Sequence, residues 1–208
     1  TPLYSSAASD VYKRQDIDMI RRGLSSSKNM DYYPTMAEFT APYTLKVGDK
    51  ILTSKMILLC TGSKPTIPLI KGLEETCYHT SDTILRLNYL PRSIAIVGGS
   101  YITAEYGHFF SAMGSKVTTI GRNPQFLPEE EPEISTLAKR ELGKNITIIT
   151  NHEVREVTRT LLGSRKLTAY NRTTNERIEV TADEILIAVG RSPNTDILHP
   201  EKGRYQSR

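Results

Sequence analysis

The chain has 208 residues, 38% of them hydrophobic and 24% charged, which allows one full domain and part of another. The formal net charge of +4 comes from scattered lysines and arginines, which argues against a nucleic-acid-binding surface. No apolar run is long enough to cross a bilayer, and the two cysteines and four histidines show no metal-ligand spacing. We therefore expect a cytoplasmic α/β protein with reduced thiols, no bound metal and no membrane or nucleic-acid partner.

The two ends of the chain differ from the rest. Residues 1–15 carry small polar side chains without sustained periodicity and without the apolar core of a signal peptide, so we expect a non-native leader. Over residues 16–24, apolar positions recur at spacings of three and four, which predicts a short helix. Residues 203–208 contain no closing element. The sequence is therefore expected to be a fragment of a longer protein.

Residues 34–60 have a hydrophobic period of two, which predicts strands. Gly48 and Asp49 mark a turn between two of them. Residues 55–60 (KMILLC) are expected to form a buried strand that runs into the turn at residues 61–65 (TGSKP). Residues 72–91 have the composition of a linker.

The next hundred residues alternate between strand and helix patterns. Strands are predicted at 93–97, 116–120, 146–149 and 185–189, and helices at 101–113 and from Glu131 to Leu142. The second helix is expected to bury Ile134, Leu137, Ala138 and Leu142. Three shorter alternating segments, at 154–160, 166–171 and 177–181, predict an antiparallel meander. This order predicts a Rossmann-like α/β domain with a central parallel sheet.

A glycine-rich loop joins the first of these strands to the first helix. Its residues, Gly98-Gly99-Ser100-Tyr101-Ile102-Thr103, lie where the backbone N–H groups of a helix N-terminus bind the pyrophosphate of a dinucleotide. Ser100 and Thr103 replace the second and third glycines of the G-x-G-x-x-G pattern, and β-branched Thr103 is expected to crowd the helix against the sheet. A plain tight turn would have a similar sequence. The strand at 116–120 favours nucleotide binding, because it ends about twenty residues after the loop, where a ribose-binding residue belongs.

Three segments together resemble the flavin-dependent pyridine nucleotide–disulfide oxidoreductases. Residues 60–65 (CTGSKP) resemble the A-T-G-S-x-P turn of this family, and residues 98–105 (GGSYITAE) resemble its nicotinamide loop. Residues 183–194 (DEILIAVGRSPN) resemble its D-x-I-L-x-A-x-G-R-x-P-N return segment. The similarity runs from about residue 16 to about residue 200 and implies that the protein uses FAD and a nicotinamide nucleotide.

The resemblance implies a nicotinamide domain at residues 93–189, inserted into a split FAD domain. Residues 16–92 and 190–208 would belong to that FAD domain. The whole protein would transfer hydride from the nicotinamide to FAD and on to an unknown disulfide-type acceptor. It would form a homodimer through a C-terminal domain beyond this sequence.

The cofactor-binding residues implied by the resemblance fall into three groups. Gly98, Gly99 and Ser100 would contact the pyrophosphate, and Ile102 belongs to the same loop. Tyr101 would cover the flavin until the nicotinamide displaces it, Glu105 would lie near the carboxamide, and Gly190 would contact the cofactor through its backbone. Thr61 and Gly62 would pass near FAD.

No catalytic residue of the family matches a position in this sequence. Cys60 and Cys77 are too far apart for the redox pair C-x-x-x-x-C, and His199-Pro200-Glu201 is not the family's acid/base motif. The sequence by itself is therefore expected to be inactive. A related NADH oxidase without redox cysteines, and a nucleotide-binding module without turnover, remain alternatives.

The end of the strand at 116–120 favours NADPH over NADH. NAD-specific proteins place an acidic residue there, whereas this chain has Gly121 followed by Arg122. Glycine removes both the acceptor for the ribose hydroxyl and the charge that would repel a 2′-phosphate. An arginine can bind that phosphate through two charge-assisted hydrogen bonds. The alternative is that Arg122 is a solvated turn residue.

Overall fold

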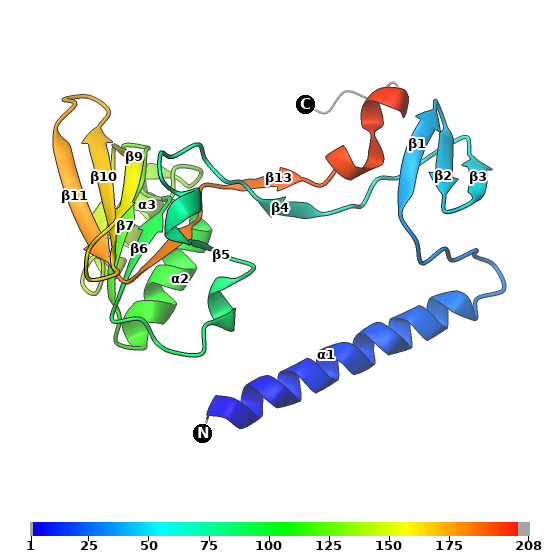
Figure 1. Cartoon of the computed structure of the whole chain (residues 1–208), viewed down its shortest axis with the longest axis horizontal. Helices are drawn as coiled ribbons and strands as arrows, with labels where there is room; N and C mark the ends of the chain where they lie inside the picture. The colour runs from blue at the N-terminus through cyan, green and yellow to red at the C-terminus, as the bar shows by residue number, and fades with distance from the viewer. Residues whose placement is uncertain (1, 204–208) are drawn as a thin grey trace. The chain divides into compact units, whose positions relative to one another are not determined.

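The structure is a computed structural model that describes residues 2–203, with the backbone alone for residues 2–11. Contacts divide the chain into two compact units, which are residues 61–194 and residues 1–60 together with 195–208. Figure 1 labels most of the helices and strands of both units. In the described part of the chain, no helix has the length and apolar character needed to span a membrane.

The unit of residues 61–194 is built on a five-stranded parallel sheet of order β5-β12-β6-β7-β8 (Figure 1). The five strands are His79–Thr80, Glu184–Ile187, Ser93–Val97, Lys116–Ile120 and Thr147–Ile149. Helix α2 (Tyr101–Ala112) connects β6 to β7, and helix α3 (Pro132–Leu142) connects β7 to β8. The α/β fold with a central parallel sheet is thereby confirmed.

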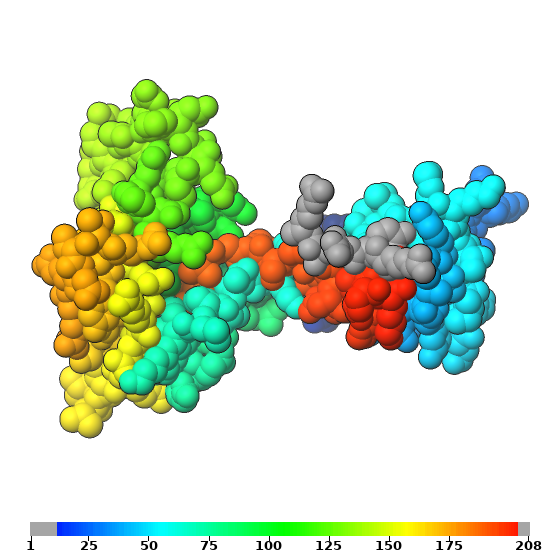
Figure 2. Space-filling view, turned by 90° about the horizontal axis from the view of Figure 1, so that it is seen from above, coloured from blue at the N-terminus to red at the C-terminus, as the bar shows by residue number. Residues whose placement is uncertain are grey.

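Three antiparallel strands form the expected meander between β8 and β12. They are β9 (His152–Arg159), β10 (Arg165–Asn171) and β11 (Arg177–Ala182), with β10 in the centre. Leu167 in β10 pairs with Val157 on one side and with Val180 on the other. Figure 2 shows these strands, in yellow and orange, gathered on one side of the unit.

The parallel sheet separates two hydrophobic cores because successive side chains of a strand point to opposite faces. In β6, Ala95 and Val97 pack with the meander core, whereas Ile94 and Ile96 pack with the core that contains α2. All four are buried, with exposed fractions of at most 6%. Burial on both faces explains why this strand is a continuous apolar run rather than an alternating one.

Helix α3 buries a narrower stripe than its sequence predicts. In α3, Ile134 and Leu137 are 48% and 45% exposed, whereas Ser135 is buried and donates its hydroxyl hydrogen bond to the carbonyl of Phe126. In α2, Phe109 remains 45% exposed. The prediction of a buried stripe in α3 is therefore wrong at Ile134 and Leu137. Periodicity locates apolar residues, but the neighbouring elements decide how wide a face they cover.

Helix α2 lies close to the parallel sheet at Gly107. A Cβ on Gly107 would lie 3.1 Å from Cδ1 of Ile146, so the side chain of Ile146 would have to shift to admit a larger residue. Thr103 is fully buried within the continuous helix α2, and its hydroxyl oxygen has no hydrogen-bond partner. The expected crowding of the helix by Thr103 stays a prediction.

The unit of residues 1–60 and 195–208 contains helix α1 (Pro2–Ser25) and a sheet of three antiparallel strands. The strands are β1 (Ala37–Ala41), β2 (Thr44–Val47) and β3 (Lys50–Thr53), and the turn before β3 contains Gly48 with a φ of +61°. Phe39 and Val47 are buried in this unit together with Leu198, from the short 3₁₀ helix Asp196–Leu198. Residues 204–208 lie outside the described part of the chain.

Two predictions for this unit differ from the structure. The helix begins at Pro2 and includes most of the expected leader, although the non-native origin of residues 1–15 stays a prediction. Residues 55–60 form no strand, and Met56 and Leu58 are 86% and 87% exposed. A buried strand needs neighbours on both edges and both faces, and no described strand pairs with this segment.

Two short strands form a separate antiparallel ribbon in the unit of residues 61–194. They are β4 (Ser63–Pro65) and β13 (Arg191–Pro193), which follow the two turns expected near the cofactors. The contacts place residues 61–92 in the same unit as the parallel sheet. Their assignment to an FAD domain, with residues 190–208, remains a prediction.

Candidate nucleotide-binding cleft

A cleft of about 870 Å³ opens at the carboxyl ends of β6, β7 and β12. The last residues of these strands, or the residues just after them, line it together with the glycine-rich loop. In open α/β sheets, ligands bind at this edge, where the loops that follow the strands converge. Of the residues predicted from the sequence, the cleft is lined by Gly98, Gly99, Ser100, Tyr101, Ile102, Arg122 and Gly190.

The glycine-rich loop has a geometry that only glycine at position 98 permits. Gly98 has a φ of +147°, and a Cβ there would lie 2.8 Å from the carbonyl carbon of Ala188 and still closer to its oxygen. The N–H of Gly98 donates to Ile120 O at 2.9 Å, and the carbonyl of Gly99 accepts from the N–H of Leu127 at 2.7 Å. The loop is therefore held in place by the end of β7 and by the segment after β7.

Helix α2 presents an uncapped N-terminus to the cleft. Ser100 occupies the N-cap position with extended backbone, but its side chain makes no capping hydrogen bond. The first N–H groups of a helix have no partner within the helix, and they carry partial positive charge. Since Ser100, Tyr101 and Ile102 all line the cleft, the N–H groups at this end of α2 can donate hydrogen bonds to the phosphate oxygens of a nucleotide.

The other end of the cleft is marked by Gly121 and Arg122. Gly121 is buried behind the loop, and a Cβ at this position would lie 3.4 Å from both Gly98 O and the Cα of Gly99. Gly121 does not line the cleft itself, whereas the exposed Arg122 does. Nη1 of Arg172 donates to the carbonyl of Arg122 at 3.3 Å, which steadies the backbone at this position.

The residues after β8 are joined to this position by backbone hydrogen bonds. The N–H of His152 donates to Gly121 O at 3.0 Å, and the N–H of Asn151 donates to Asn123 O at 2.7 Å. His152 and Asn123 both line the cleft, and neither was predicted from the sequence. No local motif marks them. Only the parallel pairing of β7 with β8 brings residue 152 beside residue 121.

At the mouth of the cleft, Tyr101 is 57% exposed and Gly190 has a φ of +128°. The carbonyl of Gly190 accepts from the N–H of Thr66 at 2.9 Å. Next to it, Nη2 of Arg191 donates to Ser63 O at 2.7 Å, and Nε of Arg191 donates to Ser63 Oγ at 2.8 Å. These contacts fix the turn after β12 against β4.

Three other predicted residues lie outside the cleft lining. Glu105 is exposed on α2, one turn beyond Tyr101. Thr61 and Gly62 precede the ribbon, where Asn194 holds them: its side-chain amide donates to Thr61 O at 3.1 Å, and its N–H donates to Gly62 O at 3.0 Å. The A-T-G-S-x-P-like turn and the G-R-x-P-N segment are therefore in direct contact.

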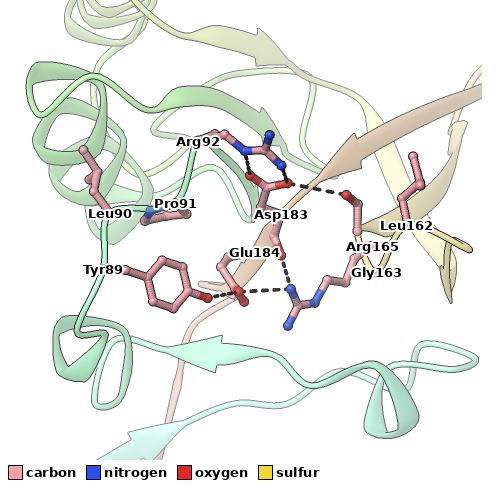
Figure 3. A pocket seen from close by; sticks show the side chains of 10 residues that line it. Tyr89, Leu90, Pro91, Arg92, Leu162, Gly163, Arg165, Asp183 and Glu184 are labelled. Carbon is pink, nitrogen blue, oxygen red and sulfur yellow. Dashed lines mark hydrogen bonds and ion pairs between the residues drawn. The ribbon is translucent and has the colours of Figure 1, made fainter.

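A second cavity, of about 340 Å³, contains a cluster of paired charges (Figure 3). Glu184 is 3% exposed and accepts from Nη1 of Arg165 at 3.0 Å and from the hydroxyl of Tyr89. The hydrogen bond between Tyr89 and Glu184 raises the pKa of Tyr89, with burial as the second cause. Arg92 and Asp183 form a more exposed pair at 3.2 Å. Because the charges neutralise one another, we interpret this cluster as structural.

The described residues contain few groups that could carry out redox chemistry or bind a metal. Cys60 and Cys77 are both free and exposed. No group of three or more histidine, cysteine, aspartate or glutamate side chains is arranged to hold a metal ion within the part of the chain that the structure describes. The cleft thus offers backbone N–H groups, a cationic side chain and apolar walls, which suit a dinucleotide.

The family described as pyridine nucleotide-disulphide oxidoreductase matches residues 8–206. The chain belongs to this family. The match includes half of the segment expected to be a leader, and it covers both compact units.

Curated relatives of this family member include reductases and dehydrogenases. Mercuric reductase of Lysinibacillus sphaericus is 33% identical over 181 residues, covering 82% of this chain and 31% of the relative. Dihydrolipoyl dehydrogenase 2 of Arabidopsis thaliana chloroplasts is 36% identical over 188 residues, covering 85% of this chain and 32% of the relative. The chain thus spans about a third of the length of these relatives.

A solved structure is similar over nearly the whole chain. It is the Cu(II) complex of the HOCl-induced flavoprotein disulfide reductase RclA from Escherichia coli, with a TM-score of 0.77 and 28% sequence identity. The similarity covers 95% of this chain and 45% of RclA. The family member described here therefore shares the fold of part of a flavoprotein disulfide reductase.

Proposed function

We propose that this chain supplies the pyridine-nucleotide-binding part of a flavin-dependent oxidoreductase that takes hydride from NADPH. When bound, the nicotinamide supplies the hydride and FAD passes the electrons to a disulfide-type acceptor. The observation that carries the proposal is the glycine-rich loop at the uncapped N-terminus of α2, which opens into the cleft. The family to which the chain belongs supports the same class of reaction.

The residues of the cleft suit a nicotinamide dinucleotide in three places. Gly98 permits the left-handed turn of the loop, because a Cβ there would collide with the backbone of Ala188, and this turn lets phosphates approach the backbone of the loop. Ser100 and the first turn of α2 provide donors for these phosphates. At the mouth, Tyr101 and the backbone of Gly190 would orient the nicotinamide, with Glu105 near its carboxamide.

The assignment of FAD rests on the turn at residues 60–65 and on the family. Asn194 ties Thr61 and Gly62 to the segment after β12, and a Cβ on Gly62 would meet no atom within 4 Å. This open backbone turn leaves space for a ligand beside it. The chain's own contribution is to position the turn, while the flavin supplies the electron chemistry.

The choice of NADPH rests on Gly121 and Arg122. Gly121 has no carboxylate that would repel a 2′-phosphate, and Arg122 lines the cleft next to it. A hydrogen bond to a charged group contributes on the order of 1.5–3 kcal/mol, which corresponds to a preference of roughly tenfold or more. We therefore expect NADPH to bind more tightly than NADH.

Titration of the purified chain with each nucleotide tests this proposal. The native chain and Arg122→Ala should bind NADH equally, whereas Arg122→Ala should lose most of the additional affinity for NADPH. Arg159→Ala serves as a matched control, because Arg159 is exposed on β9 and does not line the cleft. Failure to bind either nucleotide would contradict the proposed function, and equal native affinities would contradict the choice of NADPH.

A further inference from the structure

We propose that His152 is a second residue that determines specificity for the nucleotide, by binding the 2′-phosphate together with Arg122. The inference rests on the proposed NADPH site and adds a residue that no sequence motif indicates. It follows from where the backbone of His152 is attached and from how its imidazole ring is oriented.

The backbone places His152 beside the ribose-binding position of the fold. In dinucleotide-binding domains, the residue at the end of the second strand reads the ribose 2′ substituent. Here that residue is Gly121, and its carbonyl accepts the N–H of His152 at 3.0 Å. Gly121 itself is buried behind the loop, whereas Arg122 and His152 both line the cleft beside it. Their side chains can therefore reach the same group of a bound nucleotide.

The imidazole ring of His152 is oriented by a hydrogen bond at its Nδ1 atom. Nδ1 lies 2.8 Å from the carbonyl oxygen of Thr150, so Nδ1 carries the proton and donates to this oxygen. That hydrogen bond leaves Nε2 available to a ligand, and His152 lines the cleft. Protonation of Nε2 gives a cationic donor, which is what a phosphate dianion requires.

The charges around this position favour an anion on balance. Arg122 lines the cleft, and the guanidinium of Arg172 lies behind it on the carbonyl of residue 122. Two nearby charges on β9 neutralise each other, because Nε of Arg155 lies 3.4 Å from Oε2 of Glu153. The cleft also contains Glu129, an exposed carboxylate in the segment after β7, as an opposing charge.

Two small ligands isolate the contribution of the 2′-phosphate. The ligands 2′,5′-ADP and 5′-AMP differ only in that group, and the full chain can be titrated calorimetrically with both. His152→Ala should weaken binding of 2′,5′-ADP by roughly tenfold and leave 5′-AMP within about twofold. His152→Gln keeps a neutral donor and should give a smaller loss for the same ligand. His108→Ala is the control, since His108 is exposed on α2 outside the cleft lining.

Proton uptake distinguishes binding by His152 from a purely structural role. At a pH where the 2′-phosphate is already a dianion, 2′,5′-ADP should bind with uptake of a proton by the native chain. Comparing the binding heats in two buffers with different ionisation enthalpies measures this uptake. It should disappear in His152→Gln and persist in His108→Ala. Uptake that persists in His152→Gln would overturn the inference.

The remaining outcomes separate this inference from the proposed function. If the native chain prefers 2′,5′-ADP and Arg122→Ala removes the preference, but His152→Ala does not reduce it, only the role of His152 fails. An equal loss of both ligands in His152→Ala would make the residue structural and also reject the inference. If the native chain binds both ligands equally, the choice of NADPH fails, and the role of His152 fails with it.

Discussion

Nη1 of Arg165 lies 3.0 Å from Oε1 of Glu184, and the two side chains are only 13% and 4% exposed. Arg165 begins β10 of the meander, and Glu184 begins β12 of the parallel sheet. The pair therefore joins the meander to the parallel sheet, in addition to the hydrophobic core that they share. A buried charge that loses its partner is costly, because it stays away from water without compensation.

Glu184→Gln should lower the free energy of unfolding by about 3 kcal/mol. The amide keeps the shape of the side chain but leaves Arg165 without a counter-charge. Chemical denaturation of both proteins measures the difference. Glu179→Gln is the matched control, because Glu179 is exposed and pairs with Lys166 at 3.3 Å. Its change should stay below about 1 kcal/mol, and equal effects of the two variants would contradict a special role for Glu184.

The pKa of Tyr89 should depend on Glu184. The hydrogen bond to Glu184 holds this pKa above its usual value near 10. The folded chain then keeps the phenol proton longer than the unfolded chain. The stabilisation is fully present below about pH 10 and is lost as the pH rises through the folded-state pKa. The difference in phenolate absorbance between native chain and Tyr89→Phe reports this titration. The midpoint of the Tyr89 titration should move to lower pH in a Glu184→Gln background. An unchanged midpoint would show that Glu184 does not raise the pKa of Tyr89.

Gly98→Ala should abolish nucleotide binding and destabilise the chain by about 3 kcal/mol. The methyl group meets the carbonyl of Ala188, and the φ of +147° adds strain. Gly163→Ala separates the two effects, because Gly163 has a φ of +87° but a Cβ there would meet no atom within 4 Å. This control should lose only about 1 kcal/mol. Thermal unfolding and NADPH titration measure both quantities, and normal NADPH binding by Gly98→Ala would show that the loop is not the site.

Thr103→Val should stabilise the chain by about 1 kcal/mol. Thr103 is fully buried and its hydroxyl has no hydrogen-bond partner, so a methyl group of similar size removes an unfavourable buried polar group. Thr76→Val should do the opposite, because the buried hydroxyl of Thr76 donates to Leu73 O at 2.9 Å. Thermal melts of the two variants should therefore shift in opposite directions. Destabilisation by both would mean that the hydroxyl of Thr103 has a partner in solution.

Purified residues 1–208 should show no steady reduction of lipoamide, glutathione disulfide or mercuric ion. The only thiols are Cys60 and Cys77, which are free and too far apart in sequence for the redox pair. A dithiol that alternates with a disulfide needs two sulfur atoms within bonding distance. Sustained turnover of any of these acceptors, measured by NADPH oxidation, would contradict the prediction. The single variants Cys60→Ser and Cys77→Ser would then show which thiol is responsible.

The sequence by itself determined the fold class and most of the loop that faces the cleft. Alternation between strand and helix patterns predicted the parallel sheet, because each pattern reflects the local period of side-chain burial. Gly98 to Ile102, Arg122 and Gly190 could be found because motifs are read along the chain. The same local patterns overestimated the burial of residues 55–60 and of the apolar stripe of α3. Burial depends on neighbouring elements, which a local pattern does not contain.

The tertiary structure alone decided which residues complete the cleft. His152 and Asn123 meet there because β8 pairs in parallel with β7, so that segments following both strands end at the same edge. It also decided that Gly107 lies where α2 packs close to the sheet. Such contacts join residues distant in sequence, and their distances are set by packing between elements rather than by the propensity of any one element.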